Sequence, residues 1–378
     1  MLAIPVRQAC FTNELSTDEY VAPMLRLLID LGNASSWTGT GVAARGLIGA
    51  LQRYSANDIT VTEAGISRFA KRLRLLHRIA YLSRLRLLSM KGYDGSDVVH
   101  FTNVYCPQRH NNVATVTTVH DLDAVQHPEV YSRWYSAYYA RTVRNTVKRS
   151  DVVITDTEAV RNMILNRYNL SCDRVVATGI GLNPLFTAAI DSGSQVTHRS
   201  YPILLYIGSL QKKKNITWLI RAVVTGVKSG ALPKLRLVLA GNRGFGFGEI
   251  AAAMQSAGGL VTWIANPDIN RIAELYFSSS MLVLPSHCEG FGIPLLEAMY
   301  CRKPIVASRI PTNLEVASGV AYFFSLENAD EFYHAVQSAL DQVDAEERLT
   351  AASRRLQYYS WENLASMHTR VYKSLIVS

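Results

Sequence analysis

The sequence predicts an α/β protein of two doubly wound domains, each with a parallel sheet covered by helices on both faces. Three observations predict this fold. Short β-branched runs alternate with helical patterns along the chain, which is typical of parallel sheets. The alternation lapses once, in the polar stretch 187–201, and then resumes. At 378 residues the chain exceeds one ordinary domain and can give each of two domains its own core.

The first series of elements predicts an N-terminal domain over residues 24–190, behind an extension of residues 1–23. Its strands are expected at residues 25–31, 97–101, 114–119, 151–155 and 174–178. Its helices are expected at residues 39–54, 133–149 and 158–168. The stretch 187–201 is the best candidate for the linker that follows.

The second series predicts a C-terminal domain over residues 200–358, followed by a last helix. Its strands are expected at residues 203–208, 235–240, 260–264, 281–284, 304–307 and 320–323, and the last helix at 362–376. In such sheets the ligand crevice lies at the carboxyl ends of the strands, so the loops that follow them are the places to look for chemistry.

Composition bounds the function classes without choosing among them. The chain is 48% apolar and 18% charged, and no apolar run approaches the roughly 20 residues that span a bilayer. Five scattered cysteines without a CxxC pair, and no secretory signal, predict reduced thiols and a cytoplasmic protein. A net charge of +9 suits nucleic acid, an anionic membrane or phosphorylated small molecules.

The segment SHCEGFGIPLLEAM places Glu289 and Glu297 on either side of a Gly-Phe-Gly turn and a proline, after the strand expected at 281–284. Pro294 suits the start of a helix, and a helix start directs N–H groups at whatever lies before it. The two glycines let the backbone approach a ligand closely. The alternative is structural, with Glu297 complementing the helix dipole and Glu289 solvated in a loop.

This segment resembles the E-x7-E signature of the retaining glycosyltransferases of family 4, which have the GT-B fold of two facing Rossmann-like domains. The resemblance implies that Glu289 contacts the hydroxyls of the donor sugar and that Glu297 holds the nucleotide ribose. It also implies that the backbone between them approaches the sugar and diphosphate, at Gly290, Phe291, Gly292, Ile293, Pro294 and Leu295. Asn266, after the strand expected at 260–264, is added to the donor site.

The stretch LLYIGSLQKKKNITW resembles the basic loop of the same family, whose cations neutralise the diphosphate leaving group. Gly208 and Ser209 end its strand, and Lys213, Lys214 and Asn215 occupy the places of the family's Arg-Lys-Asn. Lys213 departs from the family's arginine and lacks its bidentate geometry, and Ser209 stands where many relatives have arginine. Without the resemblance, three adjacent lysines usually make a solvated turn.

In the first domain, Gly39 and Gly41 resemble the family's first loop, whose glycine amide meets the diphosphate. The string VHDL resembles a family motif in which the residue matching His120 contacts the donor sugar near the reacting carbon. The adjacent Asp-Leu-Asp of residues 121–123 could instead suggest a metal-binding DxD enzyme of the other major fold. We reject that reading because a single doubly wound domain does not explain the second half of the chain.

Residues 68–92 hold eight Lys or Arg and no acid, with leucines at near-helical spacing. This pattern predicts either an amphipathic helix that contacts an anionic membrane or an acceptor, or a core-packed helix with a basic outer face. The end of the chain, YSWENLASMHTRVYKSL, resembles the family's C-terminal helix, which crosses back onto the first domain over residues 359–378.

Together these patterns predict a retaining glycosyltransferase that moves a hexose, mannose or a related deoxyhexose, to a glycan or lipid-linked acceptor. His120, Glu289 and Lys214 are the expected catalytic residues, with no metal and no cofactor other than the donor. The stretch 101–122 most resembles the mannosyltransferase-like branch, which favours a GDP-sugar over a UDP-sugar. The alternatives are a sugar-nucleotide epimerase of the same fold and a basic non-enzyme that binds nucleic acid or membrane, although we expect no nucleic-acid partner.

Overall fold

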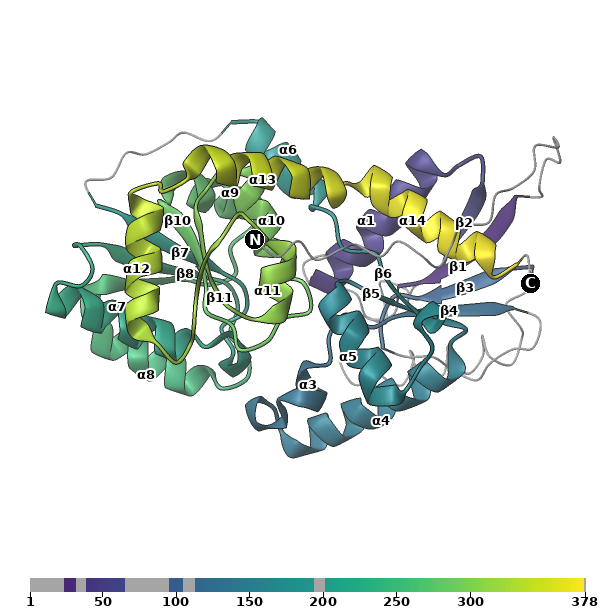
Figure 1. Ribbon diagram of the computed structural model, residues 1–378, viewed down its shortest axis with the longest axis horizontal. Coiled ribbons are helices and arrows are strands. Elements are labelled where there is room, and N and C mark those ends of the chain that lie inside the picture. The colour runs from purple at the N-terminus through teal and green to yellow at the C-terminus, as the bar shows by residue number, and fades with distance from the viewer. Residues whose placement is uncertain (1–23, 32–38, 65–94, 105–112, 194–200, 377–378) are drawn as a thin grey trace.

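The computed structural model describes residues 24–31, 39–64, 95–104, 113–193 and 201–376. They form two α/β domains side by side, each a parallel sheet between layers of helices (Figure 1). The two facing Rossmann-like domains are the GT-B architecture that the sequence predicts. The basic stretch 68–92 and the extension 1–23 lie outside the described residues.

The N-terminal sheet has six parallel strands in the order β2-β1-β3-β4-β5-β6. They are β1 Leu25–Asp30, β2 Ile59–Ala64, β3 Val98–Phe101, β4 Ala114–Thr118, β5 Val152–Thr155 and β6 Val175–Ala177. Its helices are α1 Gly39–Tyr54, α3 Asp123–Gln126, α4 Arg133–Arg149, α5 Glu158–Tyr168 and α6 Pro184–Asp191, with short 3-10 turns at Pro128–Val130 and Cys172–Arg174. The central strands β3 and β5 are buried along their whole length, as their apolar runs predict.

The C-terminal sheet has six parallel strands in the order β12-β11-β10-β7-β8-β9. They are β7 Ile203–Ile207, β8 Arg236–Ala240, β9 Val261–Ile264, β10 Met281–Leu284, β11 Ile305–Ser308 and β12 Tyr322–Phe324. Its helices are α7 Ile216–Ser229, α8 Phe247–Ala257, α9 Ile269–Ser278, α10 Ile293–Tyr300, α11 Pro311–Val316 and α12 Ala329–Leu340, with 3-10 turns at Lys212–Lys214 and Gly258–Leu260.

The strand order of the C-terminal sheet places a crevice at its centre. The chain moves outward from β7 through β8 to β9, and then returns to β10 and moves outward the other way. The loops that leave β7 and β10 therefore diverge from neighbouring strands, which is where doubly wound sheets bind ligands. These are the basic loop and the Glu289 loop.

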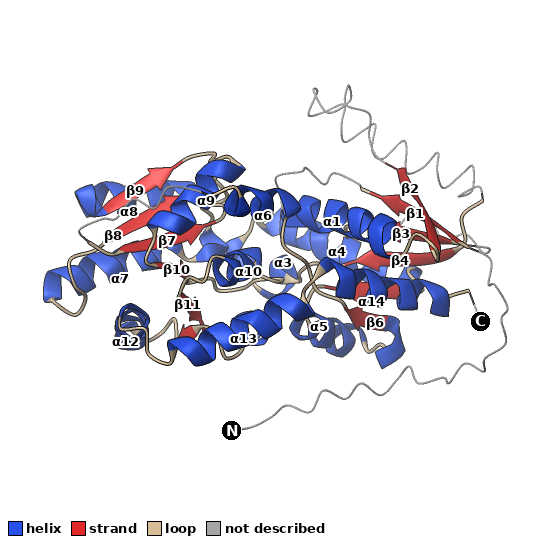
Figure 2. Cartoon of the chain, turned by 90° about the horizontal axis from the view of Figure 1, so that it is seen from above, coloured by secondary structure: helices blue, strands red, loops and turns tan. Residues whose placement is uncertain are grey.

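Two helices at the end of the chain connect the domains. Helix α13, Ala345–Tyr358, packs on α10, and helix α14, Trp361–Ser374, runs on to lie against α1 of the N-terminal domain (Figures 1 and 2). The Nε1–H of Trp361 donates to the carbonyl of Leu182 at 2.6 Å, and the hydroxyls of Ser55 and Thr369 are 2.9 Å apart. The last helix is thus part of the N-terminal domain's packing.

Three sequence expectations need correction. Strand β2 was not predicted, because only one face of Ile59–Ala64 is apolar and the strand lies at the sheet edge. The linker expected at 187–201 is wrong in its first part, since α6 continues through Asp191. Pro294 is the second residue of α10 and not the first.

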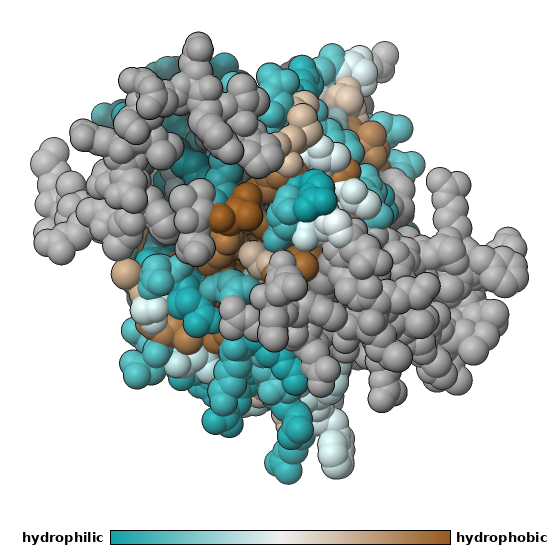
Figure 3. All heavy atoms as spheres, turned by 90° about the vertical axis from the view of Figure 1, so that its right-hand side faces the viewer, coloured by the Kyte–Doolittle hydropathy of each residue, from teal (hydrophilic) through white to brown (hydrophobic). Residues whose placement is uncertain are grey.

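Figure 3 faces the far end of the N-terminal domain. Polar and apolar side chains are interspersed over the described part of that face, with an apolar area near its centre. Among the described residues, no helix combines the length and apolar character needed to cross a membrane.

Candidate active site

Glu289 and Lys214 meet at the crevice of the C-terminal sheet. The Nζ of Lys214 lies 2.5 Å from each carboxylate oxygen of Glu289, and the hydroxyl of Ser286 donates to the same carboxylate at 2.6 Å. Burial opposes ionisation of Glu289, but the charges of Lys214 and Lys213 and these two hydrogen bonds hold the pKa of its carboxyl below its usual value. Glu289 is therefore an ionised carboxylate with a fixed orientation.

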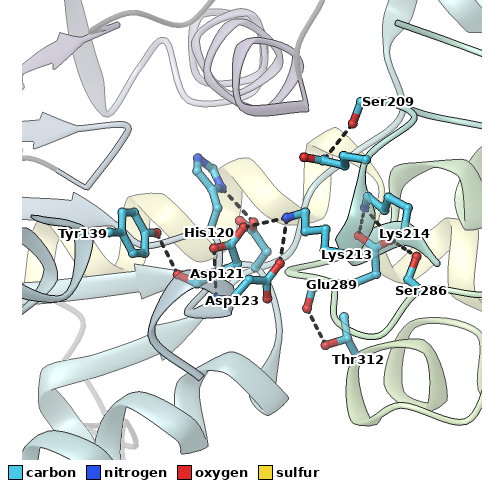
Figure 4. A network of polar contacts seen from close by, with 12 residues as sticks. His120, Asp121, Asp123, Tyr139, Ser209, Lys213, Lys214, Ser286, Glu289 and Thr312 are labelled. Carbon is cyan, nitrogen blue, oxygen red and sulfur yellow. Dashed lines mark hydrogen bonds and ion pairs between the residues drawn. The ribbon is translucent and has the colours of Figure 1, made fainter. Parts of the chain in front are cut away.

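Lys213 reaches across the cleft to the N-terminal domain (Figure 4). Its Nζ lies 2.7 Å from Asp123 Oδ2, in the first turn of α3, and 3.6 Å from Asp121 Oδ2. Burial lowers the pKa of Lys213, but the two carboxylates outweigh burial and raise it. Burial and the nearby Asp121 carboxylate raise the pKa of Asp123 to about 6. Lys213 is thus held by two carboxyl groups of the N-terminal domain.

His120 follows β4 and is paired on both ring nitrogens. Nδ1 donates to Asp156 Oδ2 at 2.7 Å, and Nε2 lies 3.1 Å from the carbonyl oxygen of Thr102. Both partners are acceptors, which favours the doubly protonated imidazolium. Burial lowers the pKa of His120, yet Asp156 and Thr102 outweigh burial and raise it. Asp156 was not predicted, although it ends the strand next to β4 and so had to lie near His120.

Gly290 lies directly against the other domain. A Cβ at this position would meet the carbonyl oxygen of His120 at 2.1 Å, so only glycine fits. The carbonyl of Gly290 accepts a hydrogen bond from Thr157 Oγ1 at 3.1 Å. The Glu289 loop is therefore docked on the N-terminal domain by its backbone.

Two helix N-termini converge in the same region. Gly39, the first residue of α1, faces Ile293, the first residue of α10, since a Cβ on Gly39 would lie 3.5 Å from Ile293 Cδ1. Gly292 before α10 has φ +88°, a left-handed conformation that favours glycine. Helix N-termini carry partial positive charge and present N–H groups, so the pair forms an anion-attracting face on each side of the cleft.

Glu297 lies in α10 and is buried without a cation beside it among the described residues. The hydroxyl of Tyr276 donates to its Oε2 at 2.9 Å. Burial raises the pKa of Glu297 to about 7, and the hydrogen bond from Tyr276 only partly offsets that. Glu289 and Glu297 thus have pKa shifts of opposite sign.

The remaining predicted residues lie at varied distances from this centre. Gly208 and Ser209 lie in the loop after β7. Gly208 has φ +143°, and the side-chain amide of Gln211 donates to Ser209 Oγ at 2.7 Å. Gly41 is buried in the first turn of α1. Phe291 and Leu295 point into the core, so only their backbone can face a ligand. Asn266 is exposed in the loop after β9. That strand lies at the edge of the sheet, and β7 and β8 separate it from β10.

This arrangement suits a ligand with both phosphate and hydroxyl groups. Two lysines and two helix N-termini can neutralise a diphosphate, and two carboxylates can accept hydrogen bonds from hydroxyls. The fold and this site define a glycosyltransferase of the GT-B fold. The family model "Glycosyltransferase Family 4" matches residues 41–183, and "Glycosyl transferases group 1" matches residues 191–356. The chain belongs to glycosyltransferase family 4.

Within that family the chain resembles the mannosyltransferases. It is 26% identical to O-antigen chain mannosyltransferase B of Escherichia coli over 290 residues, which are 74% of each protein. It is 23% identical to O-antigen chain mannosyltransferase RfbU of Salmonella typhimurium over 298 residues, which are 78% of this chain and 79% of that protein.

Solved structures share the fold at lower identity. A sucrose-phosphate synthase of Thermosynechococcus elongatus superimposes with a TM-score of 0.71 at 18% identity, over 93% of this chain and 99% of that one. WaaG, a glycosyltransferase involved in lipopolysaccharide biosynthesis, has a TM-score of 0.63 at 14% identity, over 91% and 99% of the two chains.

Proposed function

We propose that this protein transfers a hexose, mannose or a related deoxyhexose, from a GDP-sugar to a hydroxyl of a glycan or lipid-linked acceptor, with retention of configuration at the sugar. The observation that carries the proposal is the convergence of Lys213, Lys214 and the N-termini of α1 and α10 between the two domains. A nucleoside diphosphate is the ligand whose charge this set matches. The names of the two O-antigen mannosyltransferase relatives support mannose and a glycan acceptor.

Both lysines are already paired with carboxylates where the donor is proposed to bind. Lys213 is held by Asp121 and Asp123, and Lys214 by Glu289. A diphosphate between them adds one further anion beside each ammonium, and the charge that develops on the leaving phosphate is stabilised in place. Lys213 would then lie between the leaving group and the acids of the N-terminal domain.

Same-face attack fits the carboxylates of the site. The bond from the sugar's C1 to the phosphate oxygen breaks, a bond from C1 to the acceptor oxygen forms on the same face, and the acceptor proton passes to the leaving phosphate oxygen. A double displacement would need a carboxylate free to attack C1. Glu289 is oriented by Lys214 and Ser286 instead, which suits it to hold sugar hydroxyls.

His120 supports the same step from the other domain. Asp156 fixes its ring, and the backbone carbonyl of His120 lies against Gly290, close to where the resemblance places the reacting carbon. We infer that it positions the sugar, that no metal takes part, and that the enzyme acts in the cytoplasm, which free thiols at Cys288 and Cys301 support.

Thermal-shift measurements with GDP, UDP, ADP and their common sugars test the donor. We expect GDP and GDP-mannose to stabilise the protein more than the UDP compounds. UDP is the main rival because the solved structure of Anabaena HepE, which shares the fold, contains UDP and glucose. Stabilisation by UDP alone would contradict the donor proposal, and no shift with any nucleotide would contradict the site.

Glu289→Gln tests the chemistry. The amide cannot replace the carboxylate that orients Lys214 and the sugar, so we expect transfer to fall about a hundredfold or more. Glu274→Gln is the matched control, because Glu274 only makes an exposed ion pair with Arg271 on α9. Full transfer by Glu289→Gln would refute the role of Glu289, and a new free hexose isomer without acceptor would indicate an epimerase.

A further inference from the structure

An exposed group of aromatic rings stands at the beginning of helix α4. Trp134 is 89% exposed, Tyr138 is 61% exposed and Tyr135 is 46% exposed. They are three of the six strongly exposed aromatic side chains among the described residues, and they lie within five residues of sequence. Rings of this size are normally buried in part or covered by a partner, so their clustering on one helix indicates a binding surface.

The rings continue into the cleft. Tyr131, Tyr135 and Tyr139 stack in series, with ring centroids 5.6 and 5.8 Å apart. At the cleft side, Lys213 Nζ lies 5.9 Å from the Tyr131 ring centroid, and the Tyr139 hydroxyl donates to the carbonyl of Asp121 at 2.9 Å (Figure 4). Figure 1 shows the start of α4 beside α3, below the gap between the domains. Tyr135 thus connects the exposed rings to the residues that surround Lys213.

Trp134 and Tyr138 share one helix face, four residues apart, and point away from Val143 and Val147, which are buried in the domain. Ser132 caps the helix by accepting from Tyr135 N at 3.3 Å. Trp134 and Tyr138 therefore stand on a capped helix whose other face is packed in the core.

We propose that Trp134 and Tyr138 form an acceptor subsite that stacks on the pyranose rings of a saccharide chain. This inference rests on the proposed function, which requires a second substrate with a sugar hydroxyl at the cleft. The C–H face of a pyranose is apolar, and Trp and Tyr offer wide, rigid rings at little cost in conformational entropy. The first sugar would reach the cleft past Tyr131, and sugars further along the chain would rest on the two exposed rings.

The same face fits a saccharide better than a membrane. Beyond the rings, the exposed residues of α4 are Arg133, Ala137, Arg141, Arg144, Lys148 and Arg149, so no leucine, isoleucine or phenylalanine is there to enter a lipid layer. The rings gather at the cleft end, and the cations lie mainly toward the other end. Arginine beside aromatic rings can hydrogen-bond sugar hydroxyls.

Saturation-transfer NMR on the full chain tests the subsite without a donor. The probes are α-linked mannotriose and a panel of oligosaccharides ending in rhamnose, fucose, glucose or galactose, all at millimolar concentration. We expect at least one to bind, and Trp134→Ala and Tyr138→Ala each to weaken that binding about fivefold or more. Trp134→Phe should restore part of it. Tyr54→Ala, an exposed aromatic at the end of α1, is the matched control and should bind as the unchanged protein does.

The outcomes separate the subsite from the proposed function. Thermal shift with the donor nucleotide on the same samples reports whether the donor site and the fold are intact. Equal saccharide binding by all variants would overturn the inference, and so would the absence of binding by any saccharide of the panel. A third outcome would also overturn the inference. If anionic phospholipid vesicles capture the unchanged protein but not Trp134→Ala, while saccharide binding is the same in both, the rings bind a membrane.

Discussion

Glu289 and Glu297 show how neighbouring residues of one type acquire different properties. Both carboxyls are buried, so desolvation raises the pKa of each. Lys214 lies against Glu289 and reverses the effect there, whereas Glu297 accepts a hydrogen bond from the neutral hydroxyl of Tyr276. Glu289 is consequently ionised at all physiological pH values, and Glu297 titrates near pH 7.

Glu297→Gln should therefore stabilise the protein at alkaline pH. Because the pKa of Glu297 is raised from 4.5 to about 7, the folded state binds more protons than the unfolded chain, and stability is lost as pH rises between these values. The loss is at most about 3 kcal/mol above pH 7. We expect urea unfolding to show a more stable variant at pH 8 and little difference near pH 5. Because Glu297 is also the expected contact of the nucleotide ribose, we expect the donor KM of the variant to rise about tenfold.

The control for that experiment is Glu274→Gln, which changes the same group on an exposed helix face. Glu297→Gln could differ in stability from the unchanged protein by the same amount at pH 5 and at pH 8. That result would show that ionisation of Glu297 does not cause the difference. An unchanged donor KM would show that Glu297 does not hold the nucleotide.

Gly290→Ala tests whether the domains must close as tightly as observed. The added methyl would lie 2.1 Å from the His120 carbonyl oxygen, so the Glu289 loop and His120 have to separate. We expect kcat to fall about a hundredfold with the fold intact, since small misplacements at a reacting centre have effects of that size. Gly248→Ala on α8, where a Cβ meets nothing within 4 Å, is the matched control. An unchanged kcat in Gly290→Ala would mean that this contact is absent during turnover.

At the scale of elements, helix α14 is joined to the N-terminal sheet by two buried histidines. His100 hydrogen-bonds the Tyr372 hydroxyl at 2.7 Å and the Thr118 hydroxyl at 2.8 Å, and His368 Nδ1 lies 2.8 Å from the carbonyl of Leu364. Burial lowers the pKa of His368 to about 4 and that of His100 well below its usual value. Both rings are therefore neutral in the folded protein.

The free energy of unfolding should consequently decrease as the pH is lowered through the acid range. The unfolded chain binds a proton at each histidine below pH 6.5 while the folded protein does not, so stability declines from there toward pH 4, by up to about 3 kcal/mol for His368. We expect His368→Gln to flatten this decline in urea unfolding between pH 7 and pH 5. A decline as steep in the variant as in the unchanged protein would assign it to other groups.

Local signals in the sequence predicted most elements but not all of them. Helices α1, α4 and α5 begin and end where expected, because a glycine turn, Ser132 and Thr157 mark their starts. Strand β2 escaped prediction because its outer residues are polar, and α6 because Ser and Thr follow its apolar start. The Glu289 loop was identified by its motif, whose spacing is local.

At the scale of the whole molecule, the contacts that complete the site join residues far apart in the sequence. Lys213 and Asp123, or Gly290 and His120, belong to different domains, so their pairing depends on how the domains are placed. No pattern along one stretch of chain encodes that placement. The sequence therefore predicted that Lys213 and Glu289 lie in loops after neighbouring strands, but not that two acids of the N-terminal domain hold Lys213.

The last prediction concerns the contact that holds the domains together beside the cleft. Glu315 of α11 accepts hydrogen bonds from the backbone N–H groups of Glu158 and Ala159, at 2.7 and 2.8 Å, so a carboxylate of one domain caps helix α5 of the other. Such a cap is worth about 1 kcal/mol, or roughly a fivefold change in the closed population.

We expect Glu315→Ala to increase the radius of gyration in small-angle X-ray scattering without donor, and to raise donor KM. Glu347→Ala, which removes an exposed acid at the start of α13, is the control. Because the proposed donor site is formed by both domains, saturating donor should return the scattering of Glu315→Ala to that of the unchanged protein. Scattering that is unchanged in the free variant would show that Glu315 stabilises α5 alone and does not set the distance between the domains.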